Sequence, residues 1–215
     1  MKNRPFLTRP LALFLFPAAL LAAAPEARFA AMSPEELRAY ERDTLQRVAD
    51  LSLIPPVINT DPLPKYDYDR LDYGMTIGIA RTPRGRLWAV WVGGEDGPKA
   101  FMVGATSDDD GATWSKPRFA VDSQAPHLPL PRSVIVGNIW TAPDGRLWFF
   151  FDQTMNHYDG RQGVWVSVCD NPDAEKPAWS APKRIWHGAV LNKPTILANG
   201  EWLLPVEFPA FAGSG

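Results

Sequence analysis

Apolar residues recur along the chain in two different patterns. Between residues 33 and 51 they follow near-helical spacing, from Leu37 to Leu51. The segment Ser33-Pro34-Glu35-Glu36 reads as a capping box with proline at the first helical position. Pro55-Pro56 prevents the helix from continuing. These features predict one helix, followed by an extended lead-in that is rich in Pro and Asp and reaches residue 70.

From Tyr73 onward, short apolar runs bounded by Gly and Pro predict strands. The runs are rich in β-branched and aromatic residues, which favour strands over helices. They cover residues 87–92, 100–103, 147–151 and 164–166. No second helical pattern is evident.

An internal repeat organises these strands. Thr82-Pro83-Arg84-Gly85-Arg86-Leu87-Trp88 recurs as Ala142-Pro143-Asp144-Gly145-Arg146-Leu147-Trp148, with a weaker third copy at 197–203. The glycines of the three copies lie 60 and 55 residues apart. Each copy follows an apolar stretch, and glycine tolerates positive φ, so each copy predicts a hairpin turn.

A closing segment completes the first two repeats. A third strand and a Trp-Ser-x-Pro segment follow the hairpin, at 114–117 and at 179–182. Four strands in ~55–60 residues is the size of one β-propeller blade. The sequence therefore predicts an all-β, partial propeller over residues 71–215. The repeat region holds about two and a half blades, whereas propellers have at least ~4, so we expect an incomplete, poorly stable unit.

One motif carries a family resemblance. Ser107-Asp108-Asp109-Asp110-Gly111-Ala112-Thr113-Trp114 matches the Asp-box pattern at every defined position, and the counterpart at 167–179 lacks the glycine. The chain resembles the sialidase superfamily, also called the BNR-repeat family, over roughly residues 73–208. The resemblance implies a six-bladed propeller of sialidase type. It also implies an exported glycoside hydrolase acting on a terminal sugar of a glycan.

The Asp box is expected to be structural. It should form the turn between the third and fourth strands of its blade, with Ser107 at its start. Asp109 can accept hydrogen bonds from turn amides, Gly111 permits left-handed backbone, and Trp114 can wedge between blades.

Topology places the Pro-x-Gly turns and the Asp-box turn at one end of the blades, so a site is expected at the opposite end. Its predicted catalytic groups are Glu95, Asp96 and Asp152, because glycosidic cleavage uses one protonated carboxyl and a second group as base or nucleophile. The predicted substrate-binding residues are Arg70, Arg132, Gln153, His157, Arg161, Asn192, Lys193 and Glu207. Alternatives remain open: Glu95-Asp96-Gly97 as a polar turn, and Arg132 as a partner of Asp152.

Two departures from the family bear on the substrate. Authentic sialidases resemble one another in an Arg-Ile-Pro at the start of the first blade, where this chain has Met75-Thr76-Ile77. The family's Glu-Gly-Arg is replaced by Gly93-Gly94-Glu95. Sialic acid is therefore not assured, and the family's later catalytic residues would come from further blades, so this segment alone is expected to be inactive. A non-catalytic carbohydrate-binding or scaffold propeller is the alternative.

The N-terminal residues predict export. Lys2, Arg4 and Arg9 precede the apolar stretch 11–24, which is shorter than the ~20 residues that span a bilayer. A secretory signal peptide over 1–31 fits this pattern, with an uncleaved anchor as the alternative. The expected organisation is thus a signal at 1–31, a helix and lead-in at 32–70, and the propeller region at 71–215. The mature protein is expected in the periplasm or outside the cell, without a membrane span.

Composition excludes several other classes. The chain has 22 Lys and Arg against 24 Asp and Glu, a net charge of −2, which gives no basic surface for nucleic acid. Cys169 is the single cysteine, so no intrachain disulfide forms, and a buried strand thiol is expected. The three histidines share no metal-ligand spacing, and neither a metal nor a cofactor is expected.

Overall fold

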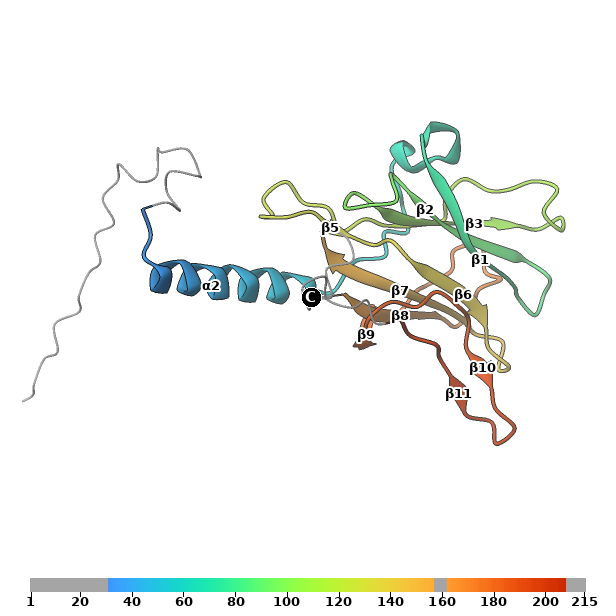
Figure 1. Ribbon diagram of the computed structural model, residues 1–215. Coiled ribbons are helices and arrows are strands. Elements are labelled where there is room, and N and C mark those ends of the chain that lie inside the picture. Colours follow the sequence, from blue (N-terminus) through green and yellow to red (C-terminus); the bar gives the residue numbers. More distant parts are fainter. Residues whose placement is uncertain (1–30, 157–161, 208–215) are drawn as a thin grey trace, which may run out of the picture. The chain divides into compact units, whose positions relative to one another are not determined.

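The computed structural model describes residues 31–156 and 162–207 (Figure 1). The predicted signal peptide, His157 and Arg161 therefore lie outside the described residues, apart from Ala31 at the end of the signal segment. The chain divides into two compact units, Met1–Leu45 and Gln46–Gly215. The boundary falls inside the helix, so the lead-in belongs to the same unit as the strands.

The predicted helix is confirmed as α2, Pro34–Ser52. Its capping box forms as expected: the Ser33 amide donates to Glu36 Oε2 at 2.9 Å, and the Glu36 amide donates to Ser33 Oγ at 3.2 Å. These bonds satisfy two amides that otherwise have no helical partner. They also hold the pKa of Glu36 below its usual value. Among the described residues, none of the helices has the length and apolar character needed to cross a membrane.

The strands form antiparallel sheets, and none of the described sheets closes into a barrel. The first sheet has the order β1-β2-β3-β4. In the second sheet β7 pairs with β5 and β6 on one side and with β8 on the other, and β9 follows β8. The strands are β1 Gly74–Arg81, β2 Leu87–Gly93, β3 Phe101–Ser107, β4 Phe119–Val121, β5 Arg132–Ser133, β6 Gly137–Thr141, β7 Leu147–Met155, β8 Gly163–Cys169, β9 Lys183–His187, and the separate hairpin β10 Thr195–Ile196 with β11 Trp202–Leu203.

The three repeat turns have the same geometry. Gly85, Gly145 and Gly200 have φ of 99°, 84° and 84°, in the left-handed region that favours glycine. Each glycine amide donates to the carbonyl three residues earlier, at 3.0, 2.9 and 2.9 Å. The prediction of three equivalent hairpins is thereby confirmed, as β1-β2, β6-β7 and β10-β11.

The Trp-Ser-x-Pro segments also occupy equivalent positions. The amides of Ser115 and Ser180 donate to the carbonyls of Thr106 and Val168, each at 2.8 Å. Their hydroxyls accept hydrogen bonds from the amides of the same two residues, each at 3.0 Å. Each segment is therefore held beside the third strand of its repeat by the same pair of backbone contacts.

The hydrophobic core lies between the first two sheets (Figure 1). Alternate residues of a strand point to opposite faces, so Trp88, Val90 and Val92 of β2 share the face that packs on the second sheet. Leu147, Phe149 and Phe151 of β7 pack on it from the second sheet, and all six side chains are fully buried.

One aromatic side chain of the second repeat inserts into this interface. The Trp179 ring lies edge-on to the rings of Trp88 and Phe119, with centroids 5.7 and 5.2 Å apart. Phe119 in turn lies 5.2 Å from Phe149. This aromatic cluster joins both repeats.

The opposite face of the second sheet packs on the third hairpin. Phe150, Val164 and Val166 contact Leu204 and Val206 in a second apolar cluster. The Trp202 ring lies edge-on to the rings of Trp140 and Trp148, at 4.7 and 5.1 Å. Successive repeats are therefore stacked face to face in sequence order.

The lead-in covers part of the other face of the first sheet. It contains two short 3₁₀ helices, Pro64–Tyr66 and Tyr68–Arg70. Asn59 forms an antiparallel bridge with Ala120. The buried Tyr66 ring lies 5.1 Å from the ring of Phe101. These contacts join the lead-in to the first sheet.

We predict that Trp179→Ala destabilises the stack by about 2–4 kcal/mol, because it removes an aromatic side chain from a packed interface. The matched variant Trp114→Ala, at the equivalent position of the first repeat, should cost under about 1 kcal/mol because this side chain lines an open groove, whereas Trp179 packs on three aromatic rings between the sheets. Urea unfolding at low protein concentration measures both. Equal losses would contradict the stacking order described here.

Candidate functional site

The Asp-box loop joins β3 to β4 and satisfies its own polar groups. Asp109 Oδ1 accepts from the Thr113 amide at 2.8 Å, and Asp109 Oδ2 accepts from the Thr113 hydroxyl at 2.6 Å. The Ser107 hydroxyl donates to Asp109 Oδ1 and accepts from the Gly111 amide at 2.8 Å. These bonds, led by that of the Thr113 hydroxyl, lower the pKa of Asp109 to about 2. Gly111 has φ of 90°, which glycine alone adopts at little cost.

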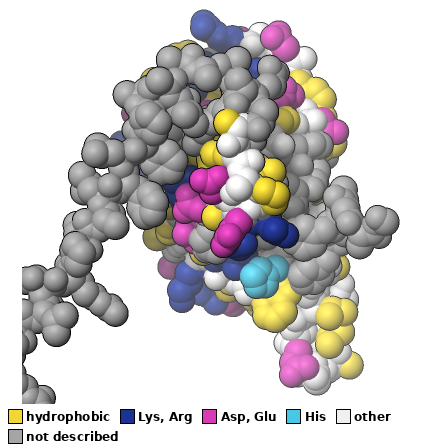
Figure 2. Space-filling view, turned by 60° about the vertical axis from the view of Figure 1, so that its left-hand side comes forward, with side chains coloured by type: hydrophobic (Ala, Val, Ile, Leu, Met, Phe, Trp, Pro, Cys, Tyr) yellow, Lys and Arg dark blue, Asp and Glu magenta, His cyan; other side chains and the backbone are white. Residues whose placement is uncertain are grey.

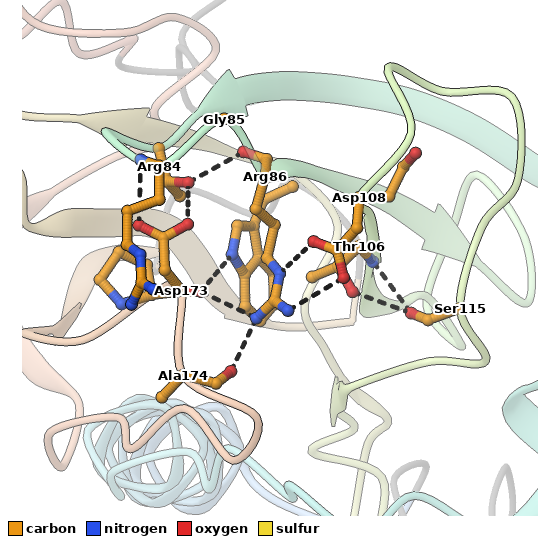
Figure 3. Close-up of polar contacts among 12 residues, drawn as sticks. Arg84, Gly85, Arg86, Thr106, Asp108, Ser115, Asp173 and Ala174 are labelled. Carbon is orange, nitrogen blue, oxygen red and sulfur yellow. Dashed lines mark hydrogen bonds and ion pairs between the residues drawn. The ribbon is translucent and has the colours of Figure 1, made fainter.

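A charged cluster links this loop to the first Pro-x-Gly turn (Figure 3). Arg86 binds Asp108 with two hydrogen bonds, from Nε to Oδ1 at 2.7 Å and from Nη2 to Oδ2 at 3.0 Å. This arrangement lowers the pKa of the Asp108 carboxyl and raises that of the guanidinium. Arg86 Nη1 also donates to the carbonyl of Ala174 in the second repeat, at 2.7 Å.

The second repeat supplies further contacts to the same turn. Asp173 accepts from the Thr82 hydroxyl and, at 3.3 Å, from the Arg84 amide. The Trp88 indole N–H donates to the Pro172 carbonyl at 3.1 Å. The loop after β8 is therefore bound to the turn between β1 and β2, as the labelled side chains of Figure 3 show.

This cluster lines an open pocket of about 420 Å³, but its charges are paired internally. Besides the Arg86–Asp108 pair, Arg81 Nη1 lies 2.7 Å from Asp110 Oδ1. Each of these two carboxylates is thus neutralised by an arginine of the same cluster. The cluster therefore joins two repeats and is a poor candidate for chemistry.

At the opposite end of the strands, the predicted carboxylates Glu95 and Asp96 lie in the connection between β2 and β3. Glu95 Oε1 accepts from the Lys99 amide at 2.8 Å, so this side chain folds back over its own turn. Asp96 is exposed. Glu95 therefore fits the alternative prediction, that this segment is only a polar turn. The carboxylate of Asp96 is exposed to solvent.

Arg132 lies beside this connection. The Gln124 side-chain amide donates to the carbonyls of Pro98 and Arg132, at 2.7 and 3.0 Å, and so joins the two segments. The Arg132 guanidinium donates to the carbonyls of Ser123 and Leu51, at 3.2 and 3.0 Å. Among the described residues no carboxylate pairs with it, and partial burial lowers the pKa of its guanidinium.

Asp152 is fully buried and does not pair with Arg132. Its Oδ1 accepts from the amides of Ile135 and Val136, at 3.0 and 2.9 Å, while Oδ2 has no hydrogen-bond partner. Burial raises the pKa of Asp152 to about 7. A carboxyl with this pKa suits general acid catalysis, but this one is enclosed and supports the backbone between β5 and β6.

Gln153 is also fully enclosed. Its Oε1 accepts from the Ser123 hydroxyl at 2.6 Å, and its Nε2 donates to the carbonyls of Ser52 and Ile54, at 2.9 and 2.8 Å. Both polar atoms are thus engaged in holding the end of α2 and the residues after it.

The remaining predicted substrate-binding residues do not gather at one point. Arg70 is exposed in the lead-in. Lys193 donates from Nζ to the Ile79 carbonyl of β1, and Asn192 Oδ1 accepts from the Lys193 amide at 2.8 Å. The exposed Glu207 pairs through its backbone with Ala189. The structure therefore brings the segments of Glu95, Asp96 and Arg132 together at one end of the strands. Gln124, which the sequence pattern did not indicate, joins them.

The chemistry of the remaining groups is limited. Cys169 is a buried free thiol in β8, as expected, and burial raises its pKa. Within the described ranges, no three His, Cys, Asp or Glu side chains are placed to hold a metal ion.

No protein-family model matches the chain, and no curated protein matches it.

We predict that Asp152→Asn changes how stability depends on pH. The folded-state pKa lies above the usual 3.8, so the stabilising contribution of Asp152 is present below about pH 4 and is lost as the pH rises through about 7. Asparagine keeps an acceptor for the two amides and carries no charge. The variant should be more stable than the unchanged protein by about 1–3 kcal/mol at pH 8, and not at pH 4. Urea midpoints across this range test it, with Asp96→Asn as control; parallel pH profiles would contradict the assignment.

We predict that Arg86→Gln destabilises the protein by about 1–3 kcal/mol, because it leaves the part-buried Ala174 carbonyl and the Asp108 carboxylate without their donor. The matched variant Arg146→Gln alters the equivalent side chain of the second repeat, which is 42% exposed against 11% for Arg86. It should cost under about 1 kcal/mol. Thermal unfolding of both variants compares them, and a larger loss for Arg146→Gln would refute the joining role of Arg86.

Proposed function

We propose that the chain forms part of a six-bladed β-propeller of sialidase type, in an exported glycoside hydrolase that acts on a terminal sugar of a glycan. The observation that carries the proposal is the complete Asp box at 107–114. It lies within repeats whose hairpin turns and closing segments form the same backbone hydrogen bonds. Stacked antiparallel sheets of about this length are what a propeller requires.

Asp96 is the carboxylate best placed for catalysis in this proposal. It is exposed, and Glu95 holds its turn by accepting the Lys99 amide. A side chain in this position can protonate the leaving-group oxygen of a glycoside or activate water, provided that a second group lies across the sugar. That second group would come from further blades.

Arg132 is the proposed anchor for the sugar. Its guanidinium has no carboxylate partner among the described residues, and its backbone carbonyl is joined to the Asp96 loop through Gln124. A guanidinium can bind a carboxylate with two parallel hydrogen bonds, which favours an acidic sugar. Sialic acid itself is not assigned, because residues 75–77 lack the arginine that the family resemblance leads one to expect.

A non-catalytic carbohydrate-binding propeller is the second candidate. It is favoured by the engagement of Glu95 and Asp152, two of the three predicted catalytic carboxylates, in hydrogen bonds to backbone amides. Fold alone does not decide between turnover and binding.

We predict that Asp96→Asn lowers glycosidase activity by about 10²–10⁴-fold, as loss of a general acid or base does. The assay uses a panel of aryl glycosides and the longest form of the protein in which this chain occurs. The control is Asp170→Asn, an exposed carboxylate after β8 that should leave turnover unchanged. Absence of hydrolysis on every sugar, with retained glycan binding, would favour the second candidate.

A further inference from the structure

The end of α2 lacks the residues that usually cap a helix. The last carbonyls of a helix have no partner within it, and they carry the negative end of its dipole. Basic side chains near the end commonly compensate this charge, but the last turn of α2 contains none. The residues after the helix, 53–56, include no glycine. Compensation therefore comes from another part of the chain.

Two side chains of the second repeat supply it. Arg132 Nη1 donates to the Leu51 carbonyl at 3.0 Å. Gln153 Nε2 donates to the carbonyls of Ser52 and Ile54, at 2.9 and 2.8 Å. Both side chains are residues that the sequence predicts for substrate binding. The end of the helix thus occupies donors that a ligand would need.

The contacts of the Arg132 guanidinium limit what else it can bind. Besides the Leu51 carbonyl on Nη1, the Ser123 carbonyl accepts from Nε at 3.2 Å. A carboxylate binds a guanidinium with two parallel hydrogen bonds, from Nε and Nη2 or from Nη1 and Nη2. Each of these two edges includes an atom that a backbone carbonyl already holds. A carboxylate therefore has full access to an edge only when one of the carbonyls leaves.

Leu51 provides the carbonyl that can leave. Ser123 is held in place, because it is buried and its hydroxyl donates to Gln153 Oε1 at 2.6 Å. Leu51 lies at the end of a helix, and Pro55, four residues later, has no N–H to donate to its carbonyl. Leu53 is 50% exposed. Helix ends with few buried contacts open at low cost in free energy.

The surface at this end of the strands is polar. Figure 2 brings forward the left-hand side of Figure 1, where β5 and β9 lie, and shows Asp and Glu side chains beside those of Lys, Arg and His. A small number of placed polar groups is what orients a polar ligand in a binding site. A surface of this kind allows a charged ligand to approach.

We propose that the end of α2 is an autoinhibitory contact, in which the Leu51 carbonyl occupies the Arg132 guanidinium until the carboxylate of an acidic sugar displaces it. The inference rests on the proposed role of Arg132 as the sugar anchor and adds the regulation of that site. A carboxylate forms a stronger hydrogen bond to a guanidinium than a carbonyl with a partial charge does. Release of the helix end and binding of the sugar therefore favour each other.

Hydrogen exchange of residues 46–54 tests the contact directly, in the longest form of the protein in which this chain occurs. With saturating glucuronate or N-acetylneuraminate, these residues should exchange about tenfold faster, because a helix end without its partners frays. Glucose, which lacks the carboxylate, should leave the exchange unchanged. Unchanged or slower exchange at saturation with the acidic sugars would overturn the proposal.

Two variants weaken the docked helix end without altering Arg132. Gln153→Met keeps the length of the side chain and removes the donor to the carbonyls of Ser52 and Ile54. Residues 46–54 should then exchange rapidly without ligand. Acidic sugar should bind about tenfold more tightly by titration calorimetry, since two hydrogen bonds no longer oppose its binding. Ser123→Ala, which removes only the bond to Gln153 Oε1, is the milder variant and should change both quantities in the same direction.

Arg86→Gln is the matched control. It also removes a side-chain donor to a backbone carbonyl, but at the opposite end of the strands. The exchange of residues 46–54 and the affinity for acidic sugar should both remain as in the unchanged protein. Near-ultraviolet circular dichroism confirms that each variant is folded.

The outcomes separate this inference from the proposed function. Equal affinity of the unchanged protein, Gln153→Met and Ser123→Ala for acidic sugar, with residues 46–54 still protected, would leave the anchor in place and refute the autoinhibitory contact. If no acidic sugar binds any of the three, or if binding persists in Arg132→Gln, Arg132 is not the anchor. Both the proposed anchor and the inference that rests on it would then be wrong.

Discussion

The packing of aromatic rings between the first two sheets is the interaction on which the rest of the structure depends. Trp88 and Phe119 come from one repeat, and Phe149 and Trp179 come from the next. Neither sheet could bury this surface alone, since each is apolar on the face that it presents to the other. Large aromatic side chains contribute most of the stabilisation in such an interface. Their contact also sets the spacing at which the polar loops at both ends of the strands meet.

The two ends of the strands use that spacing differently. At the turn end, Arg86 and Asp173 are satisfied by partners from the neighbouring repeat, so charge serves to join repeats. At the other end, Arg132 has only carbonyl partners among the described residues, and Asp96 is exposed. A guanidinium without a carboxylate partner and an exposed carboxylate on neighbouring segments are groups that a polar ligand can bind, which is why the proposed site lies there.

Buried polar groups give this second end its rigidity. Gln153 and Gln124 together hold the end of the helix, the Arg132 segment and the connection after β2. Asp152 supports the adjoining backbone through two amides. The sequence pattern predicted Gln153 as a substrate-binding residue and gave no signal for Gln124. It also could not show that Asp152, which follows an apolar run, is enclosed. The predicted catalytic role of Asp152 therefore could be assessed only once the structure showed that its side chain is buried.

The sequence by itself determined the helix, the three hairpins and the Asp-box turn. Each of these depends on hydrogen bonds within a few residues: the capping box at Ser33, the positive φ of Gly85 and its equivalents, and the contacts between Asp109 and Thr113. Tertiary structure alone decided which carboxylates are enclosed and which cations are paired. Those outcomes depend on residues far apart in the chain, whose distances are set only when the sheets stack.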